Sequence, residues 1–88
     1  MSERNILPNG TTITLIKFIP QRHEILLGDN EGHLHVFYID TFPFLLAYIK
    51  RWKLDTPIST GLLLPGDRFL IGSSEVAGVC VVSLSESS

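Results

Sequence analysis

The sequence predicts an all-β protein, and three observations support this fold class. Short runs rich in β-branched and aromatic residues, most clearly 33–39, alternate between two faces in the manner of a strand. Turn-forming residues separate the runs, among them Pro20, Asp29 to Gly32, and Pro65 to Asp67. These turn signals recur about every 8–12 residues, a spacing typical of sheets built from many short strands.

The composition fits one small folded domain. Of the 88 residues, 44% are hydrophobic and only 18% are charged, which excludes an intrinsically disordered chain. A net charge of −2 gives no broad basic surface for phosphate backbones, so the charge argues against a nucleic-acid partner. The single cysteine, Cys80, excludes an intramolecular disulfide framework and a Cys-based zinc site.

Neither a secretory signal nor a membrane span is expected. The N-terminus has no apolar stretch behind a basic start. The longest near-apolar run, 42–49, contains a proline and is shorter than the roughly 20 residues that a spanning helix needs. We therefore expect a soluble chain inside the cell, cytoplasmic or nuclear.

The first half of the chain predicts four strands. The run 12–19 carries apolar residues on both of its faces, so we expect it to be buried on two sides. The runs 23–29 and 33–39 form the clearest hairpin, joined by a turn in which Gly32 takes a positive φ. Periodicity leaves the run 44–53 open between strand and helix, and its aromatic residues favour a strand.

The second half predicts three more strands, at 57–64, 68–73 and 79–84, and it resembles the first half. The two halves align as Ile19-Pro20 over Leu64-Pro65, Ile25 to Gly28 over Phe69 to Gly72, and Gly32 to Val36 over Gly78 to Val82, with offsets of 45, 44 and 46. A period of about 40–45 residues with four short strands per unit is typical of a propeller blade.

This pattern resembles the WD-repeat β-propeller family. The resemblance rests on four features, which are an apolar strand with a proline turn (Ile16 to Pro20), a second strand ending in Gly28, an acidic-Gly turn at Glu31-Gly32, and an alternating strand at Leu34 to Tyr38. Phe37-Tyr38 stands where the family has Trp-Asp, and Ser83-Leu84 takes that place in the second unit. The Gly-His pair that precedes the first strand in the family is missing from both units.

The resemblance implies a four-stranded antiparallel blade plus a partial second blade, part of an incomplete or shared β-propeller. The chain then divides into an N-terminal lead-in (1–11), a first blade-like repeat (12–53), a second, partial repeat (54–84) and a C-terminal tail (85–88). Repeat arrays need about three units for stability, and propellers close with about 4–8 blades. We therefore expect other protein chains to complete the propeller, or a homo-oligomer.

The function expected from this organisation is that of a non-catalytic protein–protein interaction or scaffold element in a larger complex. Arg51, Trp52 and Lys53 form a basic cluster around the only Trp, and Trp and Arg are enriched at binding hot spots. We predict a partner contact there, with packing of Trp52 on the sheet as the alternative. The last strand, through Val79 and Val81, is the predicted pairing edge, because edge strands carry unpaired backbone groups.

An independent small β-barrel or sandwich that binds a ligand or RNA is the alternative to this function. Seven short strands with regularly spaced turns also fit that architecture. Solubility separates the two, because a closed barrel should be expressed as a monomer whereas blades without neighbours should aggregate.

No catalytic, metal or cofactor site is expected. His33 and His35 share a strand face and could bind a metal together with His23, but nothing fixes His23 at ligand distance, so partly exposed hairpin positions are favoured. Asp29 to Glu31 suit a hairpin turn better than a calcium site. Cys80 lies in an apolar strand, where a thiol acts as a small hydrophobe. The sequence has no nucleophile elbow, phosphate-binding loop or dinucleotide fingerprint, and no small-molecule substrate is evident.

Overall fold

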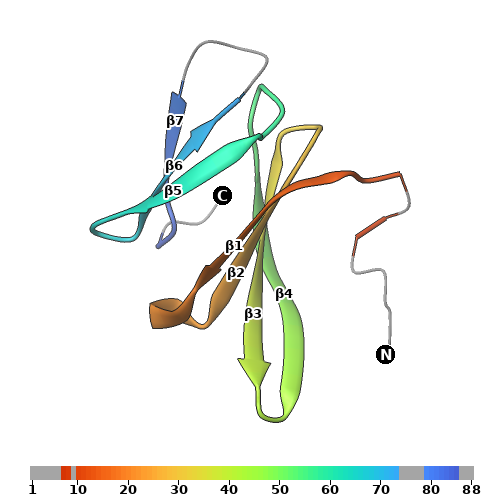
Figure 1. The fold of residues 1–88 in the computed structure, drawn as a ribbon, viewed down its shortest axis with the longest axis vertical. Helices are drawn as coiled ribbons and strands as arrows, with labels where there is room; N and C mark the ends of the chain where they lie inside the picture. The colour runs from red at the N-terminus through yellow and green to blue at the C-terminus, as the bar shows by residue number, and fades with distance from the viewer. Residues whose placement is uncertain (1–6, 9, 74–78, 86–88) are drawn as a thin grey trace.

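A computed structural model of the chain describes residues 7–8, 10–73 and 79–85 (Figure 1). Over these residues the protein is all-β, which confirms the predicted class. The elements are β1 (Ile13–Ile19), a 3₁₀ turn (Pro20–Arg22), β2 (Glu24–Asp29), β3 (His33–Thr41), β4 (Phe44–Lys53), β5 (Thr60–Leu64), β6 (Arg68–Gly72) and β7 (Val79–Ser83). Nowhere in this part of the chain is there a helix with the length and apolar character that crossing a membrane requires.

The strands form two antiparallel sheets in which neighbours in sequence are neighbours in space. The first sheet has the order β1-β2-β3-β4, and the second has the order β5-β6-β7. This division into four and three strands is the one that the sequence predicts, and the ambiguous run 44–53 is a strand. Figure 1 shows the second sheet beside one end of the first, with the β3–β4 hairpin extending away from it.

The β2–β3 turn requires a glycine. Gly32 has a φ of +88°, as the sequence predicts, and a Cβ there would lie 2.6 Å from the carbonyl oxygen of Leu54 and 2.8 Å from that of Thr56. The close approach exists because the segment that joins the two sheets runs over this turn. The backbone N–H of Leu54 donates to the Gly32 carbonyl at 2.7 Å, and that of Ile58 donates to the Asp29 carbonyl at 3.2 Å.

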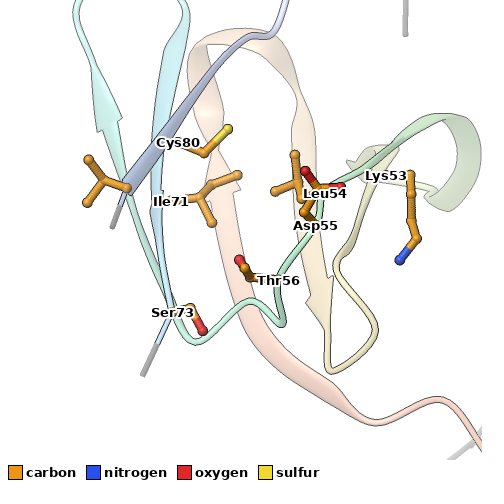
Figure 2. A pocket seen from close by; sticks show the side chains of 8 residues that line it. Lys53, Leu54, Asp55, Thr56, Ile71, Ser73 and Cys80 are labelled. Atoms are coloured by element: carbon orange, nitrogen blue, oxygen red, sulfur yellow. The ribbon is translucent and has the colours of Figure 1, made fainter. Parts of the chain in front are cut away.

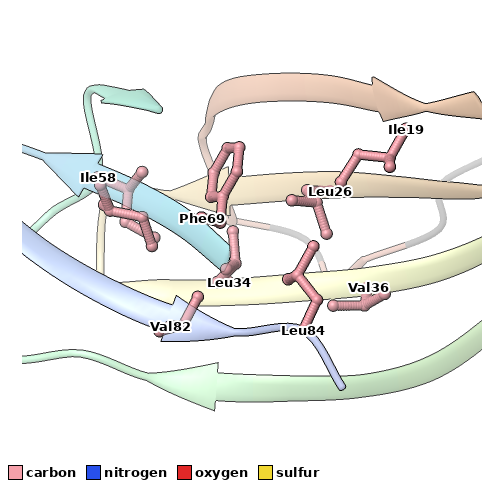
Figure 3. Close-up of a cluster of buried hydrophobic side chains, with 9 residues drawn as sticks. Ile19, Leu26, Leu34, Val36, Ile58, Phe69, Val82 and Leu84 are labelled. Atoms are coloured by element: carbon pink, nitrogen blue, oxygen red, sulfur yellow. The ribbon is translucent and has the colours of Figure 1, made fainter. Parts of the chain in front are cut away.

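The hydrophobic core lies between the two sheets (Figure 3). Leu26, Leu34 and Val36 of the first sheet meet Phe69 and Val82 of the second, and all five side chains are buried. The same cluster includes Ile19, Ile58, Ile71 and Leu84. Because full burial of such a side chain contributes about 1.5–3 kcal/mol, this contact is the main source of stability in the described part of the chain.

Polar contacts fix the second sheet on the first at one end of the core. Arg22 donates from Nε to Glu24 Oε1 at 2.8 Å, from Nη1 to Asp67 Oδ2 at 3.0 Å and from Nη2 to the Leu84 carbonyl at 3.3 Å. Lys50 Nζ donates to the same Leu84 carbonyl at 2.7 Å. The hydrogen bond to Glu24 is the largest of the effects that raise the pKa of Arg22, so this linking cation stays charged.

The two sheets have the same pairing pattern, with one correction to the alignment made from sequence. Leu26 pairs with Val36 in the first sheet, and Leu70 pairs with Val81 in the second. Leu70 is therefore the counterpart of Leu26, and Val81 is the counterpart of Val36. The sequence alignment placed Val36 over Val82, which is wrong by one residue. The difference matters because a slip of one residue turns every side chain of a strand to the opposite face.

Candidate interaction surface

Each sheet packs one face against the other sheet and carries exposed apolar side chains on its opposite face, which we call its open face. On the first open face, Ile16 and Phe18 of β1 and Tyr48 of β4 are 62%, 53% and 52% exposed, whereas Leu27 and Phe37 on the strands between them are buried. Leu15 and Ile19 point the other way, toward the core. The expectation that the first strand is buried on both sides is therefore wrong, because Ile16 and Phe18 on the outer side of β1 are exposed.

The second open face lies on the other sheet and consists of Leu62, Val79 and Val81, which are 55%, 72% and 50% exposed. Leu70, half-buried, lies between them, since it pairs with Leu62 on one side and with Val81 on the other. The predicted edge residues Val79 and Val81 thus form part of an apolar surface. Their strand is also the last in its sheet, and its outer backbone edge pairs with no strand in the described ranges.

The two open faces lie on opposite sides of the stack, because the sheets pack together through their other faces. Single exposed apolar side chains are common on any protein surface. Here they are grouped on the outer face of each sheet, on β1 and β4 in the first and on β5 and β7 in the second, which is the pattern of an interaction site.

The predicted basic cluster divides between the two faces of β4. Trp52 pairs with Leu34 and packs against the core, with Lys50 Nζ at 4.7 Å from its ring centroid. Arg51 and Lys53 point to the opposite face, since side chains alternate along a strand, and both are exposed. Lys53 Nζ donates to the backbone carbonyl of Glu31 at 2.5 Å. Trp52 therefore has the packing role that the sequence left as the alternative, while Arg51 and Lys53 remain on the surface.

A hydrogen-bonded cluster is centred on Asp29 at the start of the β2–β3 turn. Asp29 Oδ1 accepts from the backbone N–H groups of Glu31 and His33, both at 2.9 Å. Asp29 Oδ2 lies 2.9 Å from His35 Nε2 and 3.3 Å from His33 Nδ1. His35 is only 5% exposed, so the interpretation of both histidines as partly exposed positions is wrong for His35.

Opposing effects act on the Asp29 carboxyl. Burial disfavours its charged form and by itself raises the pKa. The hydrogen bond from His35, the backbone N–H groups of His33 and Glu31, and the charge of His33 together outweigh burial, so the pKa of Asp29 lies below its ordinary value of 3.8. Asp29 is therefore a carboxylate at neutral pH and organises the turn as an acceptor.

Asp29, His33 and His35 are also the described residues that could hold a metal ion, because their ligand atoms lie within 4.8 Å of one another. The third group is Asp29 and not His23, whose ring stacks on Tyr38 with centroids 6.2 Å apart. Metal binding through His35 Nε2 would move the ring proton to Nδ1, which is buried and has no hydrogen-bond partner in the described residues. The geometry fits a hydrogen-bonded turn better than a metal centre.

Two hollows adjoin these features. One of about 300 Å³ opens between the sheets, lined by the segment Lys53 to Thr56 and by Ile71, Ser73 and Cys80 (Figure 2). Cys80 is exposed there, so the expectation that it acts as a small hydrophobe within a packed strand is wrong for this chain. The other, of about 430 Å³, lies beside the Asp29 cluster and includes Arg51, a cation that opposes metal binding at this place.

Comparison with known proteins adds no relative: no family model, no curated protein and no solved structure matches the chain. Function is therefore inferred from the two open faces and the sheets that present them.

Proposed function

We propose that the chain is a non-catalytic protein–protein interaction or scaffold element that contributes blade-like sheets to a larger assembly. The observation that carries the proposal is the pair of open apolar faces on opposite sides of the stack. Contiguous apolar patches of this kind are typical of interaction surfaces. The WD-repeat-like pattern of residues 12–84 supports the same proposal, because the blades of a propeller have neighbours on both faces.

The energetics require specific neighbours. Full burial of an aliphatic or aromatic side chain contributes about 1.5–3 kcal/mol, and the six residues of the two open faces are each about half exposed or more. Covering both faces therefore offers on the order of 5–10 kcal/mol. The costs of association are of similar size, about 4–15 kcal/mol, so only a well-packed neighbour gives a stable complex.

Two further features extend the proposed contact surface beyond the apolar faces. The outer edge of β7, at Val79 and Val81, can accept a strand from a partner, because its backbone groups face no described strand. Arg51 and Lys53 lie exposed at the rim of the first sheet, where charged side chains favour partner selection and association rate. Trp52 supports this rim from the covered side.

The second candidate is an independent small sandwich that binds a ligand or RNA. The observation in its favour is that two stacked sheets enclose a buried core. A self-sufficient antiparallel sandwich, however, has polar residues on its outer faces. The first outer face of this chain also carries Arg51 and Lys53, but the exposed apolar side chains on both outer faces favour the assembly proposal.

Light scattering on the purified full chain tests the proposal. We expect a mass above 9.8 kDa or, where the chain remains monomeric, marginal stability together with binding of a fluorescent hydrophobic dye to the open faces. The result against the proposal is a 9.8 kDa monomer that unfolds cooperatively and binds no dye.

A further inference from the structure

The two sheets pack on each other through faces that do not correspond to one another in the strand pairing. We call the face that carries Leu26 and Val36 in the first sheet, and their counterparts Leu70 and Val81 in the second, the leading face. The opposite face of each sheet is the trailing face. Inside the chain, the leading face of the first sheet packs on the trailing face of the second, which carries Phe69 (Figure 3).

The open faces are therefore one of each kind. The first sheet leaves part of its trailing face exposed, at Ile16 and Phe18, whereas Leu27 and Phe37 on the same face are buried. The second sheet leaves its leading face open, and this is the face of Leu62 and Val81. Each copy of the chain thus exposes apolar side chains on one face of each kind.

The sizes of four side chains at the centre of this contact are complementary. In the internal contact, a Cβ on Gly61 of the trailing face would lie 3.0 Å from Leu15 Cδ2 of the leading face, and the Phe69 ring of the same sheet would be closer still, at 2.4 Å. The counterpart of Leu15 in the second sheet is Thr60, and the counterpart of Gly61 in the first sheet is Ile16. A large side chain meets a small one inside the chain, and the same packing between two copies would set the smaller Thr60 opposite the larger Ile16.

We infer that the leading face of one copy packs on the trailing face of the next, head to tail, as the two sheets do within the chain. This inference rests on the proposed function and names the neighbour as a second copy. The contact is heterologous, so it generates a closed ring or an open filament. Rings of sheets typically close with about 4–8 members, and each copy adds two sheets, so closure takes about two to four copies.

A mixing experiment with two face variants of the full chain tests the inference. Phe18→Asp places a charge on the trailing face, and Val81→Asp places one on the leading face. Leu45→Asp is the matched control, because Leu45 is 51% exposed in β4 and lies on neither open face. Native mass is measured by size-exclusion chromatography with light scattering, and circular dichroism checks that each variant is folded.

The expected result is a multiple of 9.8 kDa for the wild type and for Leu45→Asp, and 9.8 kDa for each face variant alone. An equimolar mixture of Phe18→Asp and Val81→Asp forms a 1:1 dimer of about twice the monomer mass, because each variant keeps the face that the other lacks. Where a variant does not fold, Ile16→Asp replaces Phe18→Asp and Leu62→Asp replaces Val81→Asp.

Two kinds of result overturn the inference. If the wild type associates and either face variant still associates alone, or the mixture stays monomeric, head-to-tail packing is wrong while the proposed function stands. If the wild type is monomeric but binds hydrophobic dye and is marginally stable, a different chain is the neighbour, and again only this inference fails. A cooperative monomer that binds no dye overturns both.

Discussion

Val36 and Val81 occupy the same position in the pairing of their two sheets, yet Val36 is fully buried and Val81 is 50% exposed. The difference comes from the neighbour, since the second sheet covers Val36 and nothing in the described chain covers Val81. The same sequence pattern therefore makes a core in one sheet and a surface in the other. This relationship is the physical basis for proposing assembly.

Replacing Gly32 by alanine is expected to lower the free energy of unfolding by about 2 kcal/mol or more. The positive φ costs about 1–2 kcal/mol for an L-residue, and the new Cβ would meet the carbonyls of Leu54 and Thr56. Urea denaturation measures the change. The matched control is Gly66→Ala, because Gly66 has a φ of +80° but its nearest contact is Arg68 Nε at 3.8 Å. Equal losses for both variants would show that the approach of the linking segment is unimportant.

Asp29→Asn is expected to remove part of the acid sensitivity of the fold. The pKa of Asp29 is lowered in the folded chain, so its contribution is fully present above the unfolded value near 3.8 and is lost as pH falls through the lower folded value. The wild type should lose stability below about pH 4, with a smaller pH slope in the variant. At pH 7 the variant should be less stable by about 1–3 kcal/mol. Urea denaturation at several pH values checks this, and identical slopes would exclude Asp29 as the titrating group.

Trp52 and Arg51 should respond differently to truncation. Trp52→Ala is expected to cost about 2–4 kcal/mol, because Trp52 packs against the core and beneath Lys50. Arg51→Ala should change stability by no more than about 0.5 kcal/mol, since Arg51 is exposed. Thermal denaturation of the two variants under one set of conditions makes the comparison. A Trp52→Ala variant as stable as the wild type would return Trp52 to the contact surface.

Zinc or nickel is expected to leave the melting temperature unchanged. Binding through His35 Nε2 would place a proton on the unpartnered Nδ1, and Arg51 lies beside the same cluster. Differential scanning fluorimetry with and without metal measures this, with His35→Ala as the control for weak surface binding. A rise of several degrees that His35→Ala abolishes would identify Asp29, His33 and His35 as a metal site.

Local patterns in the sequence predict much of the fold. The Asp29 to Gly32 turn, the alternation of 33–39 and the aromatic character of 44–53 are properties of adjacent residues, and the structure confirms the strands that they predict. Simple alternation along β4 would predict which face of the strand carries Trp52. A register shift between Val36 and Phe37, however, changes which residues of β3 lie opposite those of β4. That shift has no local signal.

The Asp29 cluster illustrates what local reasoning misses. The sequence predicts that His33 and His35 lie close together, because both residues are on the same face of one strand. Their partner comes from the end of the preceding strand, and the hairpin register alone brings it within 2.9 Å of His35. The spacing of Asp29, His33 and His35 at i, i+4 and i+6 across a tight turn is the signal that could have identified it.

Urea unfolding of the full chain over a hundred-fold range of protein concentration is the decisive test of association through the open faces. If the open faces hold copies together, unfolding is coupled to dissociation, and the midpoint should rise with concentration, more strongly for the wild type than for Val81→Asp. A single cooperative transition whose midpoint is the same at every concentration, in the wild type and in Val81→Asp alike, would show that the open faces do not hold copies of this chain together.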